Sequence, residues 1–288
     1  MSGSRCSARD PELLQAILRV VPAATLGPWL IIVAGFLEGA PRVTLWAGAL
    51  AVDYLGILIG HMRGWRVSPD HFVERHGLVV IIALGESIVA IGVGAAGLPL
   101  DAGTIAAALL GITVIAALWW SYFDWVMFYA RAMLAEATGV DRAILARDLY
   151  SSLHLPMVAG IVLFAFGLKT TLAHVDDPLG IIPAIGLCGG LAMYLFAHVA
   201  MRLRMHGGWG HGRPTATVLL LGMIPLAAAV PALVALGLVA TVCAALIAYE
   251  ALRYPYARAW IRSRRGAFTM EEASRVAGTR GRNPLPPD

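Results

Sequence analysis

Two acidic residues, Asp53 and Glu86, each lie about ten residues from either end of a long apolar stretch. A carboxylate inside hydrocarbon needs a partner, a water-filled cavity or a bound proton. Adjacent antiparallel spans would bring both carboxyls to the middle of the membrane, where two like charges cannot both ionise cheaply. This favours a pair that exchanges protons or binds a cation. The alternative is that each is neutral and hydrogen-bonded to Ser87, Tyr54 or the backbone as a packing contact.

A second group of ionisable residues lies near the ends of apolar stretches. Its members are Arg19, Asp124, His154, His198 and Glu250. Tyr150 precedes His154 by four residues, so the two share a helix face. The group could line a vestibule or a proton path leading to the carboxyl pair. The alternative is a set of interfacial ion pairs and long side chains that reach toward water.

The third apolar stretch has a polar entry, SPDHFVERHG, at residues 68–77. Ser68 can cap a helix and Pro69 suits its first position, so a helix is predicted from about 69 to 97. Its first two turns would lie in the membrane interface.

The charged residues of this entry, Glu74, Arg75 and His76, are candidate site residues. Arg75 and Glu86 are eleven residues apart, nearly three helical turns, and would share a face that points into the bundle. His71, Glu74 and His76 do not have the spacing of a zinc motif, so we predict no metal site and no cofactor.

The elements that must position these residues are transmembrane helices. Apolar residues make up 59% of the 288 residues and charged residues only 14%, about half the usual share of a soluble domain. The apolar residues form blocks long enough to cross about 30 Å of hydrocarbon. We predict an all-α polytopic bundle of about eight spans over 13–254, between disordered segments 1–12 and 255–288. The spans are expected at 16–37, 43–62, 77–97, 103–129, 151–170, 180–201, 215–230 and 232–252.

The distribution of basic residues sets the orientation of the spans. Of the 22 lysines and arginines, 20 fall in alternate polar segments, when Arg19 at the edge of the first span is counted with the N-terminal segment. The other two are Arg42 and Lys169. Positive segments stay in the cytoplasm, so both termini are predicted there. The apolar block 215–252 contains Pro231, which can break a helix. A single helix over this block would place the arginine-rich tail outside, so two helices are predicted.

Membrane lipids are the partners that the sequence indicates. Arginines of the tail 255–288 could bind anionic headgroups; a merely solvated tail is the alternative. Segment 130–150 is expected to be a short helix on the membrane surface. The basic residues flank apolar blocks, so nucleic-acid binding is not predicted. Small residues recur four apart, which favours packing within one bundle and leaves a homo-oligomer open. They are Gly56 and Gly60, Gly186 and Gly190, and Gly103, Ala107 and Gly111.

Residues 71–92, HFVERHGLVVIIALGESIVAIG, resemble the signature of the bacterial low temperature requirement A membrane proteins. Further support comes from WWSYFD at 119–124, and from YSSLHLPMVAGIVLFAFGLK at 150–169 followed by His174. The resemblance covers roughly residues 12–260. It implies a multi-pass protein of the bacterial cytoplasmic membrane, in a family named for a cold-growth phenotype and without an established biochemical activity.

The family's N-terminal spans, which carry an acidic, phenylalanine-rich motif of the type LFFDLVFV, have no counterpart in this sequence. The resemblance therefore implies a fragment, a mis-set start or a shortened homologue. If the missing helices contribute to the site, Asp53 and Glu86 would form only half of it.

Three functions are compatible with these patterns. The first is a transporter or channel for a small ion or solute, with protons or cations handled at Asp53 and Glu86. The second is an intramembrane enzyme acting on a lipid or lipid-linked substrate, with His154, Asp124 and Tyr150 near the headgroups. The third is a non-catalytic membrane factor that supports growth in the cold. The sequence favours the first.

Overall fold

The computed structural model describes residues 11–59, 62–206 and 208–254. Within these residues the chain is helical apart from its loops and one isolated bridge between Pro178 and Pro231. The helices form two units. The first unit comprises Met1–Ser68 and Ala137–Ser152, and the second comprises Pro69–Glu136 and Leu153–Asp288.

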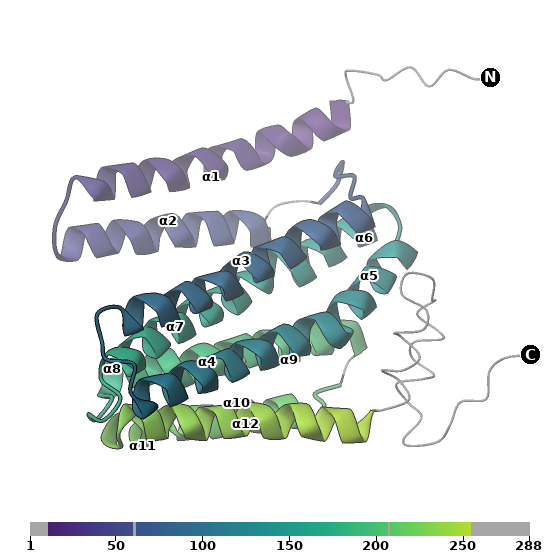
Figure 1. Cartoon of the computed structure of the whole chain (residues 1–288). Coiled ribbons are helices and arrows are strands. Elements are labelled where there is room, and N and C mark those ends of the chain that lie inside the picture. Colours follow the sequence, from purple (N-terminus) through teal and green to yellow (C-terminus); the bar gives the residue numbers. More distant parts are fainter. Residues whose placement is uncertain (1–10, 60–61, 207, 255–288) are drawn as a thin grey trace, which may run out of the picture. The chain divides into compact units, whose positions relative to one another are not determined.

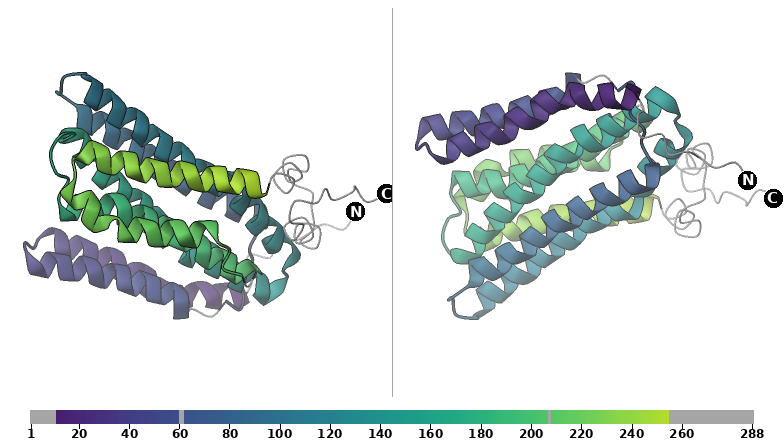
Figure 2. Two further views of the ribbon diagram at one scale, coloured as in Figure 1. Left: turned by 90° about the horizontal axis from the view of Figure 1, so that it is seen from below. Right: turned by 90° about the horizontal axis from the view of Figure 1, so that it is seen from above.

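The first unit is built on an antiparallel pair of helices that lie side by side (Figures 1 and 2). Its helices are α1 (Pro11–Gly35), α2 (Ala40–Ile59) and α6 (Gly139–Ala146), followed by the π-helical turn η2 (Arg147–Ser152). Two hydrogen bonds connect α2 and η2. The Tyr54 hydroxyl donates to the Ser152 carbonyl at 3.4 Å, and Arg147 donates to the Leu58 carbonyl at 3.3 Å.

The second unit is a bundle of long helices whose directions alternate along the chain (Figure 1). The first are α3 (Pro69–Ala95), α4 (Ala102–Ser121), η1 (Tyr122–Val126), α5 (Met127–Glu136) and α7 (His154–Ala173). The remainder are α8 (Ile181–Ala184), η3 (Ile185–Gly189), α9 (Gly190–His206), α10 (Gly212–Gly222), α11 (Ile224–Ala229) and α12 (Ala232–Arg253). Helix α7 packs against α3 on one side and α9 on another, while α12 packs against α4 and α10.

Seven of the described helical segments are long and apolar enough to cross a membrane. They are Leu13–Gly35, Pro69–Ala95, Ala102–Glu136, Gly139–Ala173, Ile181–Met205, Gly212–Ala229 and Ala232–Arg253. The predicted span 43–62 corresponds to α2, a 20-residue helix that is outside this set. Arg42, Asp53 and Tyr54 lower its apolar character. The predicted polytopic helical bundle is confirmed.

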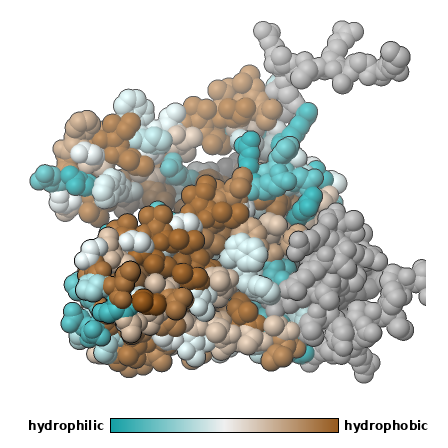
Figure 3. Space-filling view, in the orientation of Figure 1, coloured by the Kyte–Doolittle hydropathy of each residue, from teal (hydrophilic) through white to brown (hydrophobic). Residues whose placement is uncertain are grey.

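Large apolar side chains remain exposed on the helices of the second unit, as a hydrocarbon solvent requires. Figure 3 shows them over the middle of the helices, with hydrophilic residues gathered toward the helix ends. On α3 the exposed set comprises Leu78, Val79, Ile81, Ile82, Ile88, Val89 and Val93. A soluble protein rarely exposes an apolar surface of this extent.

The block 215–252 is divided in the structure. Helix α11 ends at Ala229, Val230 is extended, and Pro231 precedes the first residue of α12. Hydrogen bonds to the loop after α7 fix the chain at this break. The Ala232 amide donates to the Asp177 carbonyl at 2.9 Å, and the Leu233 amide donates to the Val175 carbonyl at 3.0 Å.

Segment 130–150 differs from the single surface helix that was predicted. Its first residues continue α4 and η1 through α5 to Glu136, and a new helix begins at Gly139, whose φ is +53°. The physical reason is the pair Thr138–Gly139. A glycine takes a positive φ without steric cost, so the chain ends one helix and starts another here.

Close approach of α7 and α9 depends on glycine. A Cβ atom at Gly160 would lie 2.5 Å from the Gly190 carbonyl oxygen, and one at Gly190 would lie 2.6 Å from the Gly160 carbonyl oxygen. About two turns further along α7, a Cβ atom at Gly167 would lie 2.5 Å from the backbone nitrogen of Leu187 in η3. Gly186 and Gly190 therefore pack within the bundle. Gly60 lies outside the described residues.

Helix α4 begins with a side-chain cap whose strength is predicted to depend on pH. The Asp101 carboxylate accepts a hydrogen bond of 2.8 Å from the Thr104 amide, which lowers the pKa of Asp101 below its ordinary value of 3.8. A lowered pKa means that the cap stabilises the helix above pH 3.8 and is lost as the pH falls through the lowered value. We expect an acid-dependent shift of the Thr104 amide resonance. Asp101→Asn, a neutral cap, should remove that shift and keep the helix; a shift that persists would contradict the assignment.

Candidate functional site

Eight polar side chains lie together at the end of the second unit where α3 and α10 begin and α9 and α12 end. They are His76, Ser121, Tyr122, His154, Tyr194, His198, Arg213 and Glu250. We call this set the buried polar cluster. Five of its members, Ser121, Tyr122, His154, Tyr194 and His198, are buried. The charge pattern of the sequence predicts that this end faces the cytoplasm.

The α3 side of the cluster is a contact between two histidines and a tyrosine. The Tyr122 hydroxyl and His154 Nε2 are 2.9 Å apart, and the rings of His154 and His76 have centroids 5.2 Å apart. His76 Nδ1 lies 2.8 Å from the Phe72 carbonyl, which requires Nδ1 to carry the proton. These groups can each accept or release a proton, as a relay requires.

The centre of the cluster is formed by Tyr194 and His198 on α9. Their ring centroids are 4.4 Å apart, and the ring centroid of His198 lies 6.2 Å from that of Tyr122. His198 Nδ1 lies 2.9 Å from the Tyr194 carbonyl, so Nδ1 carries a proton. In the neutral form of the ring the other nitrogen, Nε2, is a hydrogen-bond acceptor. It is buried and has no hydrogen-bond partner.

Two hydroxyl groups share one backbone carbonyl beside this centre. The Tyr194 hydroxyl lies 2.7 Å from the Leu118 carbonyl oxygen and the Ser121 hydroxyl lies 2.8 Å from it. The two hydroxyl oxygens are themselves 2.9 Å apart. The two hydroxyl groups thus have two protons for three short oxygen–oxygen contacts.

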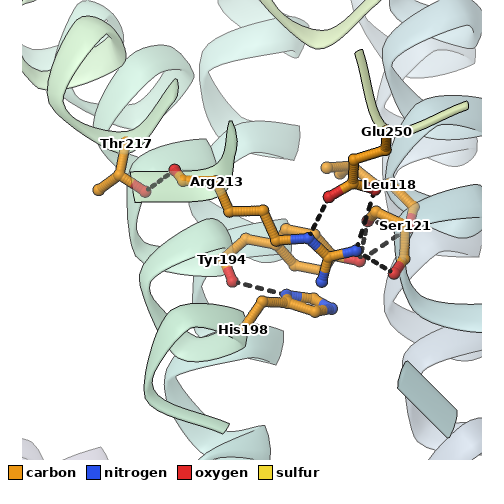
Figure 4. A network of polar contacts seen from close by, with 7 residues as sticks. All are labelled: Leu118, Ser121, Tyr194, His198, Arg213, Thr217 and Glu250. Atoms are coloured by element: carbon orange, nitrogen blue, oxygen red, sulfur yellow. Dashed lines mark hydrogen bonds and ion pairs between the residues drawn. The ribbon is translucent and has the colours of Figure 1, made fainter. Parts of the chain in front are cut away.

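The other side of the cluster is a buried ion pair between α10 and α12. Arg213 Nε lies 2.7 Å from Glu250 Oε1, and the two side chains are only 13% and 14% exposed. The same guanidinium donates to the Ser121 carbonyl at 3.0 Å and lies above the ring of His198 (Figure 4). The Asp124 carboxyl is within electrostatic range of Arg213. A buried cation held by a carboxylate and a carbonyl satisfies the requirement for paired charges in an apolar interior.

A π-helical turn brings Tyr122 into the cluster. In η1 the Met127 amide donates to the Tyr122 carbonyl, five residues earlier instead of four. The Tyr122 amide is shared between the carbonyls of Leu118 and Trp119. Such wide turns inside long helices are frequent at functional sites.

A pocket with a volume of about 100 Å³ opens beside the Arg213 end of the cluster. Its polar walls are His198, Arg202, His211, Arg213 and Glu250. Its aromatic walls are Trp125, Trp209, Tyr249 and Tyr254. The lining is apolar for the most part with a few convergent polar groups, a composition that small-molecule sites share. Over the described residues, no three histidine, cysteine or acidic side chains come together as metal ligands.

Asp53 lies in the first unit, half-buried on α2. Its carboxyl packs against the backbone of Gly27 on α1, because a Cβ atom added at Gly27 would overlap the carboxyl group. Glu86 lies in the second unit. The two carboxyls thus belong to separate units, and their pairing stays a prediction.

Glu86 is exposed on α3, and so are Glu74 and Arg75. The residue next to Glu86, Ser87, is buried, and its hydroxyl has no hydrogen-bond partner. The predicted inward face of Arg75 and Glu86 therefore lies on the outside of the second unit. The stripe of α3 that packs inward comprises Val73, Gly77, Val80, Ala83, Leu84, Ser87, Ala90 and Gly94. These small and apolar side chains can be buried without desolvating a charge.

The second predicted group is divided between the units. His154, His198 and Asp124 lie in the second unit, whereas Tyr150 lies at η2 in the first. The sequence reasoning included Glu250 but missed Ser121, Tyr122, Tyr194 and Arg213. A usable signal was the i, i+4 spacing of Tyr194 and His198, which places both on one helix face.

The helices and this cluster define a multi-pass membrane protein with a polar site inside its bundle. Residues 4–248 match the model of the bacterial low temperature requirement A protein family. The chain belongs to this family, as its motifs predicted.

A curated relative is Uncharacterized protein RA0937 of Rhizobium meliloti (strain 1021), which is 32% identical over 177 residues. The match covers 57% of this chain and 42% of the relative, so the chain spans less than half of that protein's length. No solved structure matches the chain.

Proposed function

We propose that the protein moves a small ion or solute across the bacterial cytoplasmic membrane and exchanges protons through the buried polar cluster. The observation that carries this proposal is the burial of contacting histidine, tyrosine, arginine and glutamate side chains inside a membrane bundle. Ionisable groups are expensive in such an interior and are typical of proton and ion pathways.

The arrangement gives each group a role. His76, His154 and Tyr122 form a chain of protonatable contacts from α3 to the centre of the unit. His198, whose ring contacts Tyr122 and which lines the pocket, continues this chain. Glu86 and Asp53 would carry protons at the middle of the membrane, beyond the level of the cluster.

Lipid contacts complete the proposal. Exposed apolar side chains on the helices would contact acyl chains, and the arginines of the tail would contact anionic headgroups. The tail 255–288 lies outside the described residues. A homo-oligomer remains compatible with the small-residue helix faces.

Proton flux into proteoliposomes tests this function. An inside-negative potassium diffusion potential should acidify liposomes that contain the protein, as followed with an internal pH dye. His154→Gln and Glu86→Gln should each slow acidification by about tenfold or more, because a relay that loses a protonatable member loses a step. Asp53→Asn tests the other predicted mid-membrane carboxyl in the same acidification assay.

His174→Gln is the matched control, since this histidine lies in the loop after α7 with 62% of its side chain exposed. It should leave the acidification rate unchanged. Rates for His154→Gln, Glu86→Gln and Asp53→Asn that all equal the wild-type rate would overturn the proposal.

A further inference from the structure

Two residues that line the pocket beside Arg213 each carry a buried polar atom without a hydrogen-bond partner. His198 is only 1% exposed, and its Nε2 has no hydrogen-bond partner. Arg202 Nε, one helical turn further along α9, is likewise buried without a partner. Both residues line the pocket. Buried polar groups are nearly always paired, so unpaired atoms on residues that line a cavity point to a ligand that reaches them.

The charges of the residues that line the pocket favour a ligand of negative charge. Arg213 is neutralised by Glu250 at 2.7 Å, and its remaining hydrogen bond goes to the Ser121 carbonyl. No carboxylate pairs with Arg202 among the described ion pairs. A guanidinium with an open Nε donor is a typical partner of a carboxylate, phosphate or sulfate oxygen.

The position of the proton on His198 sets a second requirement for the ligand. The Nδ1 proton of His198 is committed to the Tyr194 carbonyl, so in the neutral ring Nε2 carries a lone pair. An anion would be repelled by that lone pair unless a proton lies between them. The ring of Tyr122 from η1 contacts His198, and His154 from α7 and Arg213 from α10 lie within its electrostatic range. Glu250 from α12 lines the same pocket, and Asp124 from η1 lies within electrostatic range of Arg213.

We propose that this pocket binds a compact oxyanion together with one proton, with Arg202 holding the anion and His198 Nε2 holding the proton. The aromatic walls, including Trp125 and Tyr249, would contact the apolar body of a larger oxyanion. Because one ligand and one proton enter together, the site would couple a solute to the relay described above. This deepens the proposed function by naming the solute class, and it is tested by binding alone.

The probe is sulfate, which keeps its protonation state near neutral pH. Isothermal titration of the protein in phosphatidylcholine nanodiscs should give saturable binding. Repeating the titration in two buffers of different ionisation enthalpy should report the uptake of one proton. Arg202→Gln should weaken binding by about ten- to a hundredfold, the worth of one charged hydrogen bond. His198→Gln should abolish proton uptake.

Arg204→Gln is the matched control, because it removes the same charge from an exposed position on the same helix, outside the pocket. It should bind sulfate like the wild type. The proposal is overturned if sulfate does not bind, or if Arg202→Gln and Arg204→Gln bind equally. Binding without proton uptake overturns the role of His198.

A second arm separates a free oxyanion from a lipid headgroup. Phosphatidylglycerol in the nanodiscs offers a phosphodiester with the same chemistry. Loss of sulfate binding there would support the site with a lipid as its natural occupant, and unchanged binding would support it with a soluble one. Sulfate binding in a protein that shows no proton flux would retain this site and reject only the transport proposal.

Discussion

Replacing Glu250 by glutamine is expected to lower the free energy of unfolding by about 3 to 5 kcal/mol, because Arg213 would keep its charge without a carboxylate partner. The pair is short, 2.7 Å, and its side chains are 13% and 14% exposed, so solvent screens the lost interaction only weakly. Denaturant unfolding in detergent micelles, followed by circular dichroism, measures the change.

The ion pair between Asp70 and Arg131 is a matched control for this prediction. Its nitrogen and oxygen are 2.8 Å apart, but its side chains are 62% and 37% exposed. Asp70→Asn should therefore cost about 0 to 1 kcal/mol. Replacing the buried pair together, as Arg213→Met with Glu250→Leu, should recover most of the loss of the single variant. Equal costs for Glu250→Gln and Asp70→Asn would contradict the burial argument.

Gly190→Ala is expected to lower the free energy of unfolding by about 3 kcal/mol, the upper end of the usual cost of overpacking. The added methyl would lie 2.6 Å from both the Gly160 carbonyl oxygen and the Phe164 backbone nitrogen. Backbone atoms in a helix cannot rotate away as side chains do, so α7 and α9 would have to separate. The same unfolding assay measures the loss.

Gly92→Ala supplies the comparison, because nothing lies within 4 Å of a Cβ atom at Gly92 on α3. This variant should be neutral or more stable by up to about 1 kcal/mol, since alanine favours a helix over glycine. A stability loss of the same size in both variants would show that helix α7–α9 contact is not the cause.

The bundle was predictable from the sequence because its determinants are local. Long apolar blocks, Pro231 between two helices and the motif at 71–92 each act within a short segment of chain. Even the glycines at 186 and 190 could be recognised from their spacing alone.

The site was only partly predictable, because its partners are far apart in the chain. Arg213 belongs by sequence to a basic loop before an apolar block, and its role depends on Glu250, 37 residues later. Tyr122 is brought into the cluster by a π-helical turn that regular helical periodicity does not indicate. Glu86 was expected inside the bundle, but the small residues of α3 take the inward face.

The carbonyl of Leu118, shared by the hydroxyls of Tyr194 and Ser121, gives this region an unusual electrical property. With three short contacts and two protons, either hydroxyl can donate to the carbonyl while the other donates to its neighbour. The two arrangements differ in the direction of their dipole and need no movement of heavy atoms. Hydrogen-bonded groups polarise one another in a low dielectric. The triangle can therefore change the direction of its dipole beside Arg213, which makes the local medium more polarisable than the surrounding apolar side chains when a charge enters or leaves.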